Sequence, residues 1–110
     1  MATSITGNLH NITQRVAMDS TAGNCEAVTL PTWAKKCTIA FKQSDGSTND
    51  SGKLAFSGTD GAAIGTDFMP ISSGGAYSFD VAGGGRDSSG LIIYIAADTN
   101  SAYAHIHVEG

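Results

Sequence analysis

The last twenty residues constrain the fold of this 110-residue chain more than any other segment. The apolar run Leu91–Ala97 is followed by four polar residues and then by strict alternation from Ala102 to Glu109. Alternation with a period of two places apolar side chains on one face of a strand and polar side chains on the other. The two runs and the polar break between them therefore predict a β-hairpin with one packed face and one hydrated face.

Short apolar runs separated by turn residues continue along the whole chain. The runs are rich in β-branched and aromatic residues, and the breaks contain many of the 14 glycines. No long window keeps the helical period. The pattern predicts an all-β fold, a single β-sandwich of jelly-roll type with about eight short antiparallel strands. The predicted strands are Ile12–Met18, Glu26–Pro31, Lys36–Lys42, Lys53–Ser57, Thr66–Ile71, Tyr77–Val81, Leu91–Ala97 and Ala102–Glu109.

The length and charge of the chain limit its organisation and its partners. A chain of this length predicts one domain over residues 1–110, with residues 1–9 as a candidate N-terminal arm. The net charge is −4 and the only pair of adjacent basic residues is Lys35-Lys36, which disfavours binding to nucleic acid. No apolar run approaches the length needed to cross a bilayer, and the first residues lack a secretory signal. We therefore expect synthesis in a cytoplasm and no membrane partner.

Two cysteines, Cys25 and Cys37, have no Cys-x-x-Cys partner, which disfavours a cysteine zinc site. Two reduced, buried thiols are the favoured interpretation in a reducing compartment. A disulfide formed after export of a particle stays open as an alternative, because it would close a loop of about a dozen residues.

His105 and His107 lie on the polar side of the last predicted strand, about 7 Å apart along the chain. Three such strands around a threefold axis could hold a transition metal, so both histidines are candidate metal ligands. A hydrated strand face is the favoured interpretation, because no third ligand lies at a suitable spacing. The serines and cysteines also show no nucleophile-and-base pattern, so we expect neither catalytic residues nor a cofactor.

The segment Leu91–Ala97 is apolar on both faces, whereas a strand of a two-layer sandwich has one hydrated face. Either a loop or another subunit must cover the second face, and Ile92 and Tyr94 are therefore candidate partner contacts. Trp33 is a third candidate, since large aromatic residues are enriched at interfaces. A core plug at the end of the sandwich is an equally good interpretation of Trp33.

Four long segments together resemble the small β-sandwich virion proteins of tailed bacteriophages. They read SITGNLHNITQRVAM, VTLPTWAKKCTIAF, SGKLAFSGTDGAAIGTDFMPISSGGAYSFDV and IYIAADTNSAYAHIHVEG. Members of that group decorate or cement capsids, often as trimers, or occur in head fibres and tails. The resemblance implies a structural protein of the virion and transfers no individual site residue.

The function expected from this resemblance is capsid decoration, in which the protein binds the major capsid protein on the outer surface of the shell and stabilises it. A tail, head-fibre or host-binding module, with carbohydrate as one class of ligand, is the first alternative. A small binding domain with no role in a virion is the second. A homo-oligomer, with a trimer favoured, is expected in the first case.

Overall fold

The computed structural model describes residues 2–7, 10–81 and 90–110, and in these residues every regular element is a β-strand. The all-β prediction is therefore confirmed, and each of the eight predicted segments contains a strand. Two further strands of two residues each, β1 and β5, were not predicted. The strands are β1 Thr3–Ser4, β2 Asn11–Ala17, β3 Glu26–Thr29, β4 Lys36–Lys42, β5 Asn49–Asp50, β6 Gly52–Ala55, β7 Met69–Ile71, β8 Tyr77–Asp80, β9 Ile92–Ala97 and β10 Tyr103–Glu109.

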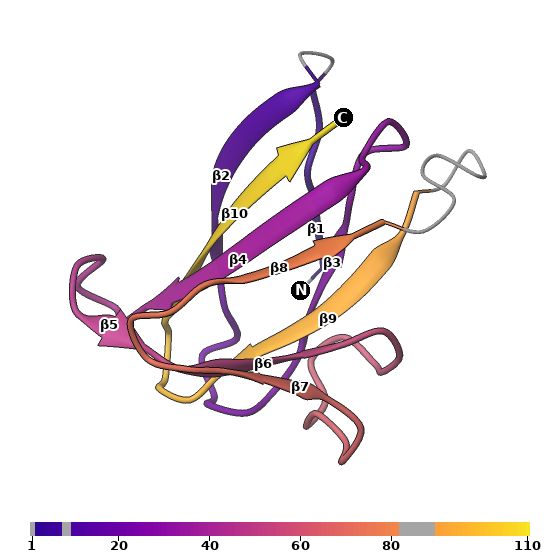
Figure 1. Cartoon of the computed structure of the whole chain (residues 1–110). Helices are drawn as coiled ribbons and strands as arrows, with labels where there is room; N and C mark the ends of the chain where they lie inside the picture. Colours follow the sequence, from indigo (N-terminus) through magenta and orange to yellow (C-terminus); the bar gives the residue numbers. More distant parts are fainter. Residues whose placement is uncertain (1, 8–9, 82–89) are drawn as a thin grey trace.

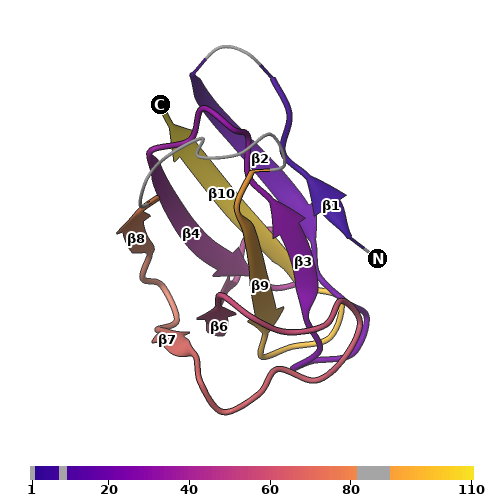
Figure 2. The same cartoon turned by 90° about the vertical axis from the view of Figure 1, so that its right-hand side faces the viewer.

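The strands form two sheets that lie against each other (Figure 1, Figure 2). Sheet A has the order β1-β3-β9-β6-β7, and sheet B has the order β2-β10-β4-β5, with β8 also paired to β4. Strands β8 and β5 follow one another along the same edge of β4, since β8 pairs with its first half and β5 with its last two residues. All pairings are antiparallel except that of β1 with β3.

The eight longer strands pair in a nested order. Strand β6 pairs with β7, β4 with β8, β3 with β9, and β2 with β10. The chain between β6 and β7 is thus the centre of one long folded ribbon whose two arms run side by side. Strands from the two ends of the chain meet in this way, so most contacts join residues distant in sequence.

The predicted C-terminal hairpin is wrong. Strand β9 lies in sheet A between β3 and β6, whereas β10 lies in sheet B between β2 and β4. The four polar residues that separate them connect the two sheets, and Ser101 in this connection has a positive φ of 54°. Alternation reports which face of a strand is buried, but it carries no information about the strand that pairs with it.

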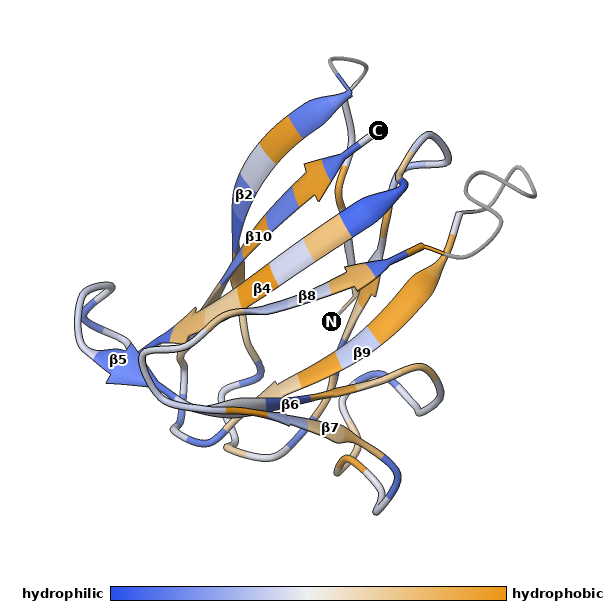
Figure 3. Ribbon diagram, in the orientation of Figure 1, coloured by the Kyte–Doolittle hydropathy of each residue, from blue (hydrophilic) through white to orange (hydrophobic). Residues whose placement is uncertain are grey.

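One hydrophobic core lies between the sheets. Its inner rows include Ile39 and Phe41 from β4, Ile106 from β10, and Ile93 and Ile95 from β9, each at most 1% exposed. Polar residues alternate with these rows along β2, β4 and β10, as the colours of Figure 3 show. The alternation that predicted the strands therefore corresponds to a buried and an outer face.

Several strand ends differ from the prediction. The segment Thr66–Ile71 forms a strand only from Met69, because its first residues belong to the loop between β6 and β7. Strand β6 begins at Gly52 and not at Lys53. Near the N-terminus, β1 pairs with β3 and the side chain of Ile5 is 2% exposed.

Among the residues that the structure describes, no helix is long and apolar enough to cross a membrane.

Candidate interaction surfaces

The outer face of sheet A carries two of the predicted contact residues. Ile92 and Tyr94 point away from the core on β9, as does Ala96. Ile92 is 40% exposed, Tyr94 is half-buried and Ala96 is fully buried. Exposure of this strand face therefore falls from its beginning to its end.

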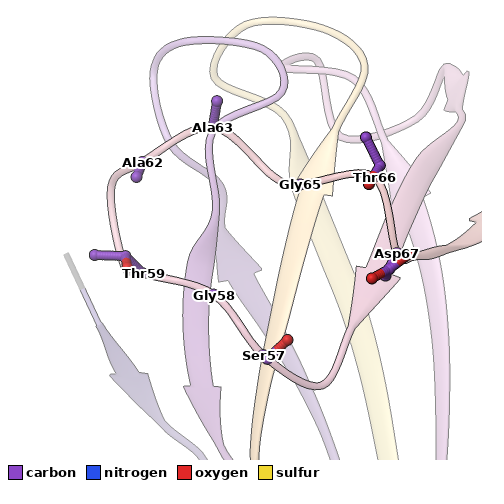
Figure 4. A pocket seen from close by; sticks show the side chains of 8 residues that line it. All are labelled: Ser57, Gly58, Thr59, Ala62, Ala63, Gly65, Thr66 and Asp67. Carbon is purple, nitrogen blue, oxygen red and sulfur yellow. The ribbon is translucent and has the colours of Figure 1, made fainter.

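The β6–β7 loop, residues 56–68, folds back over this face (Figure 4). Its anchors are main-chain hydrogen bonds to the residues just before β3. The amide of Cys25 donates to the carbonyl of Ala62 at 2.7 Å, and the amide of Gly61 donates to the carbonyl of Cys25 at 2.8 Å. The loop is therefore tied to sheet A at its middle, well away from the ends of β6 and β7.

Small residues let this loop approach the sheet closely. A Cβ atom at Gly58 would lie 3.3 Å from the ring of Tyr94, so the loop main chain passes directly beside that ring. Part of the second apolar face of β9 is thus covered by the chain itself, which was one of the two expected arrangements. Ile92 stays exposed, and its role as a partner contact remains a prediction.

The loop also borders a hollow of about 390 Å³. The side chains of Ser57 and Asp67 point into the space that the loop encloses, whereas the side chain of Thr59 points away from that space (Figure 4). A hydroxyl and a carboxylate facing one space provide hydrogen-bond donors and acceptors for a polar ligand. The complete lining is Ser57, Gly58, Thr59, Ala62, Ala63, Gly65, Thr66 and Asp67.

A second apolar surface, which the sequence analysis missed, lies where β6 ends and β7 begins. We call Phe56, Phe68 and Met69 the apolar edge patch. Phe56 is 52% exposed and Met69 46%, and both border a hollow of about 310 Å³ together with Phe68. The ring of Phe56 meets that of Phe79 on β8 edge to face, with centroids 5.3 Å apart. The patch therefore lies beside a contact that joins sheet A to sheet B.

Trp33 lies in the connection between β3 and β4 and packs, half-buried, against the hydrophobic core. Its ring stacks on that of His10 with centroids 5.1 Å apart, and its Nε1–H donates to the carbonyl of Gly7 at 2.8 Å. These contacts place the indole at the end of the core. A contact between Trp33 and a partner remains a prediction.

His105 and His107 lie on the outer face of β10, opposite the buried Ile106. Nδ1 of His107 and the hydroxyl of Thr13 on β2 are 2.7 Å apart and share a hydrogen bond. Nε2 of His105 is buried without a hydrogen-bond partner, and its neighbours in register are Arg15 and Ala40. Within the described ranges, no group of three potential metal-ligating side chains was found. The two histidines remain candidate ligands that lack a third.

Both cysteines are buried free thiols in this structure. Cys25 precedes β3 in sheet A, and Cys37 lies in β4 of sheet B. Burial raises the pKa of the Cys37 thiol to about 12. Burial, and to a lesser extent the carboxylate of Asp60, also raises the pKa of Cys25. Thiols held in the neutral form are poor nucleophiles and poor metal ligands.

The fold and these surfaces define a class, an all-β protein with two packed sheets. No protein-family model and no curated protein matches the chain. Among solved structures, the chain is similar to the coat protein of Tobacco streak virus, with 8% sequence identity and a TM-score of 0.37. The match covers 96% of this chain and 89% of that one.

Proposed function

We propose that this chain is a structural protein of a virion, and more specifically a capsid decoration or cement protein of a tailed bacteriophage. The proposal includes a jelly-roll β-sandwich as the fold. The nested pairing of β6 with β7, β4 with β8, β3 with β9 and β2 with β10 supports that description, and double-sheet jelly rolls occur in capsid and lectin domains. Because one fold serves many functions, the proposal also depends on the sequence resemblance given above.

The observation that carries the proposal is the apolar edge patch, which lies open at the edge of sheet A. Phe56 and Met69, 52% and 46% exposed, lie together in the apolar edge patch, and Ile92, 40% exposed, lies apart from them on the outer face of β9. Exposed apolar residues that gather in a patch are typical of surfaces that bind another protein. The proposed partner is the major capsid protein, on the outer surface of the assembled shell.

The proposed mechanism is thermodynamic linkage. A protein that binds the assembled shell, but not its separate subunits, stabilises the shell in proportion to its binding free energy. A homo-oligomer, with a trimer favoured, would multiply weak contacts through effective concentration. In this role the protein is not an enzyme, needs no cofactor and binds neither nucleic acid nor membrane. It is made in the host cytoplasm and resides on the capsid surface.

Heat resistance of virions assembled with and without the protein tests this function. We expect particles without it to stay assembled but to release DNA at a lower temperature, and added purified protein to restore resistance. A variant with Met69→Ser and Ile92→Ser should restore less, whereas Ser44→Ala, at an exposed residue after β4, should restore resistance fully. Equal heat resistance with and without the protein would refute the proposal.

A tail, head-fibre or host-binding module is the second candidate. The hollow bordered by Ser57 and Asp67 favours it, because hydroxyl and carboxylate groups are suited to a polar ligand such as a carbohydrate. This candidate predicts that the isolated protein binds host cells, and that Asp67→Ala reduces the binding while Asp80→Ala, at an exposed carboxylate of β8, does not. Isolated protein that fails to bind host cells, together with labelled protein spread over the head shell and absent from tails and fibres, would exclude it.

A further inference from the structure

Strand β2 is the longest strand at an edge of either sheet in the described part of the chain. It has seven residues, whereas β1 and β5 have two, β7 has three and β8 has four. Among the described residues no strand lies beyond it, as Figure 1 shows at the side of sheet B opposite β8. A long edge strand offers a row of unpaired main-chain groups to any second strand.

Two hydrogen bonds fix which main-chain groups of β2 are unpaired. The amide of Met18 donates to the carbonyl of Ala102, and the amide of Gly110 donates to the carbonyl of His10, both at 2.9 Å. Between these ends β2 and β10 keep one continuous register. Hydrogen-bonded pairs alternate along an antiparallel ladder, so the even-numbered residues of β2 bond to β10. The odd-numbered residues direct their N–H and C=O groups away from β10, toward the open edge.

The odd-numbered residues are Asn11, Thr13, Arg15 and Ala17, and all four are exposed. Protected edges usually carry a proline, a bulge or a charge that projects outward. Strand β7 has such protection in Pro70, but β2 contains no proline and pairs with β10 without a bulge.

The side chains of β2 also leave its edge accessible. The guanidinium of Arg15 stacks on the ring of Tyr103 at 4.3 Å, over the neighbouring strand. The hydroxyl of Thr13 bonds to His107, which is likewise on β10. The one charge of β2 and its central hydroxyl thus lie toward the middle of the sheet, and neither blocks the approach of a second strand.

We propose that β2 pairs in antiparallel orientation with β2 of a second copy of this chain, which joins two sheets B across a twofold axis. The register is centred on Gln14, which faces Gln14 of the second copy. Thr13 then faces Arg15 of the second copy, and Asn11 faces Ala17. Every hydrogen-bonded pair in this register is formed by odd-numbered residues, so each unpaired main-chain group of β2 gains a partner.

Self-complementarity identifies the occupant as a second copy. In the proposed register Arg15 does not face another arginine, so no like charges oppose each other. The half-buried Ile12 faces Val16 of the second copy on the core side of the joined sheet. A contact of this isologous type closes with two copies, and it therefore differs from the threefold assembly that the phage resemblance implies. The inference does not depend on the proposed function.

Two variants at one position test the contact. Thr13→Pro removes an N–H that points to the open edge, a position where a strand accepts proline without loss of its own ladder. Thr13→Val keeps this N–H, and both variants lose the hydroxyl that bonds to His107. By light scattering after gel filtration, we expect a dimer for the natural protein and for Thr13→Val, and half that mass for Thr13→Pro.

Amide hydrogen exchange in the natural protein gives a second measurement, which decides the question if Thr13→Pro fails to fold. As concentration rises, the amides of Thr13 and Arg15 should exchange more slowly, by at least roughly tenfold. The amide of Gln14, which already bonds to β10, should change little and serves as the control. A monomer at every concentration, a trimer whose mass is unchanged by Thr13→Pro, or rapid exchange at Thr13 in a dimer would each overturn the proposal.

Discussion

Gly52 lies at the start of β6, where the strand faces the ring of Phe41 across the core. A Cβ atom on Gly52 would lie 2.6 Å from both Cδ2 and Cζ of that ring, which is 1% exposed. Ordinary contacts between carbon atoms begin near 3.5 Å. Gly52→Ala therefore forces the ring of Phe41 to move within a closely packed interior.

The expected cost follows from two opposing effects. Overpacking of a core by a methyl group typically destabilises by about 1–3 kcal/mol. Replacement of glycine by alanine within a strand offsets about 0.5–1 kcal/mol of this, because the unfolded chain becomes less flexible. We expect Gly52→Ala to lower the free energy of unfolding by about 1–2 kcal/mol. In a domain of this size the melting temperature should fall by about 4–10 °C.

A double-mutant cycle with Phe41→Leu locates the cause. The leucine is smaller and should cost about 1–2 kcal/mol by itself, but it makes room for the new methyl group. Urea unfolding, followed by the fluorescence of the single Trp33, should show the double variant at least about 1 kcal/mol more stable than the sum of both changes predicts. Additivity of the two changes, or a Gly52→Ala variant as stable as the natural protein, would refute this account of the packing.

Three further predictions concern single groups. A hydrogen bond from the hydroxyl of Ser51 is the main cause that lowers the pKa of Asp98 below its ordinary value of 3.8. The stabilisation that ionised Asp98 gives the folded protein is therefore complete above pH 3.8 and is lost as the pH falls through the lowered pKa. Ser51→Ala should move the titration midpoint of Asp98 upward, as measured by NMR. Burial raises the pKa of Cys37 to about 12. Iodoacetamide at mildly alkaline pH should therefore label this thiol only after denaturant is added, as measured by mass spectrometry. Rapid labelling of the folded protein would contradict this. Thr99 donates its hydroxyl to Asp50 at 2.7 Å, and Asp50 is 4% exposed, so Thr99→Val should cost about 1–3 kcal/mol in urea unfolding while Thr99→Ser costs clearly less.

The sequence predicted the positions of the longer strands well because each of them has one buried and one outer face. The segment Lys36–Lys42 has the same bounds in the prediction and in the structure, and its residues alternate strictly between buried and partly exposed. Strand β5 has no such pattern, since it consists of only two residues, which pair with the end of β4 across the turn that follows it. Local pattern therefore could not predict it.

The pairing of the strands was harder to predict from the sequence than their positions. A break of four polar residues suits a hairpin and also suits a connection between two sheets. The partners of β9 are β3 and β6, and those of β10 are β2 and β4, and all four precede them by more than thirty residues in the sequence. The exposure of residues just past a strand end was equally hard to predict. Phe56 continues the inward alternation of β6, yet it lies beyond the end of that strand and is 52% exposed.

For the second apolar face of β9, the sequence predicted only part of the candidate interaction site. The apolar pattern predicted that this face is covered, but it did not indicate whether a loop or another subunit covers it. The β6–β7 loop consists largely of glycine, alanine and threonine, and its main chain passes close to the ring of Tyr94 at Gly58. The middle of β9 is therefore already occupied by the chain itself. Ile92 and the apolar edge patch hold the large apolar side chains that the described chain leaves most exposed, so we expect an apolar contact between sheet A and a partner at one of these two places.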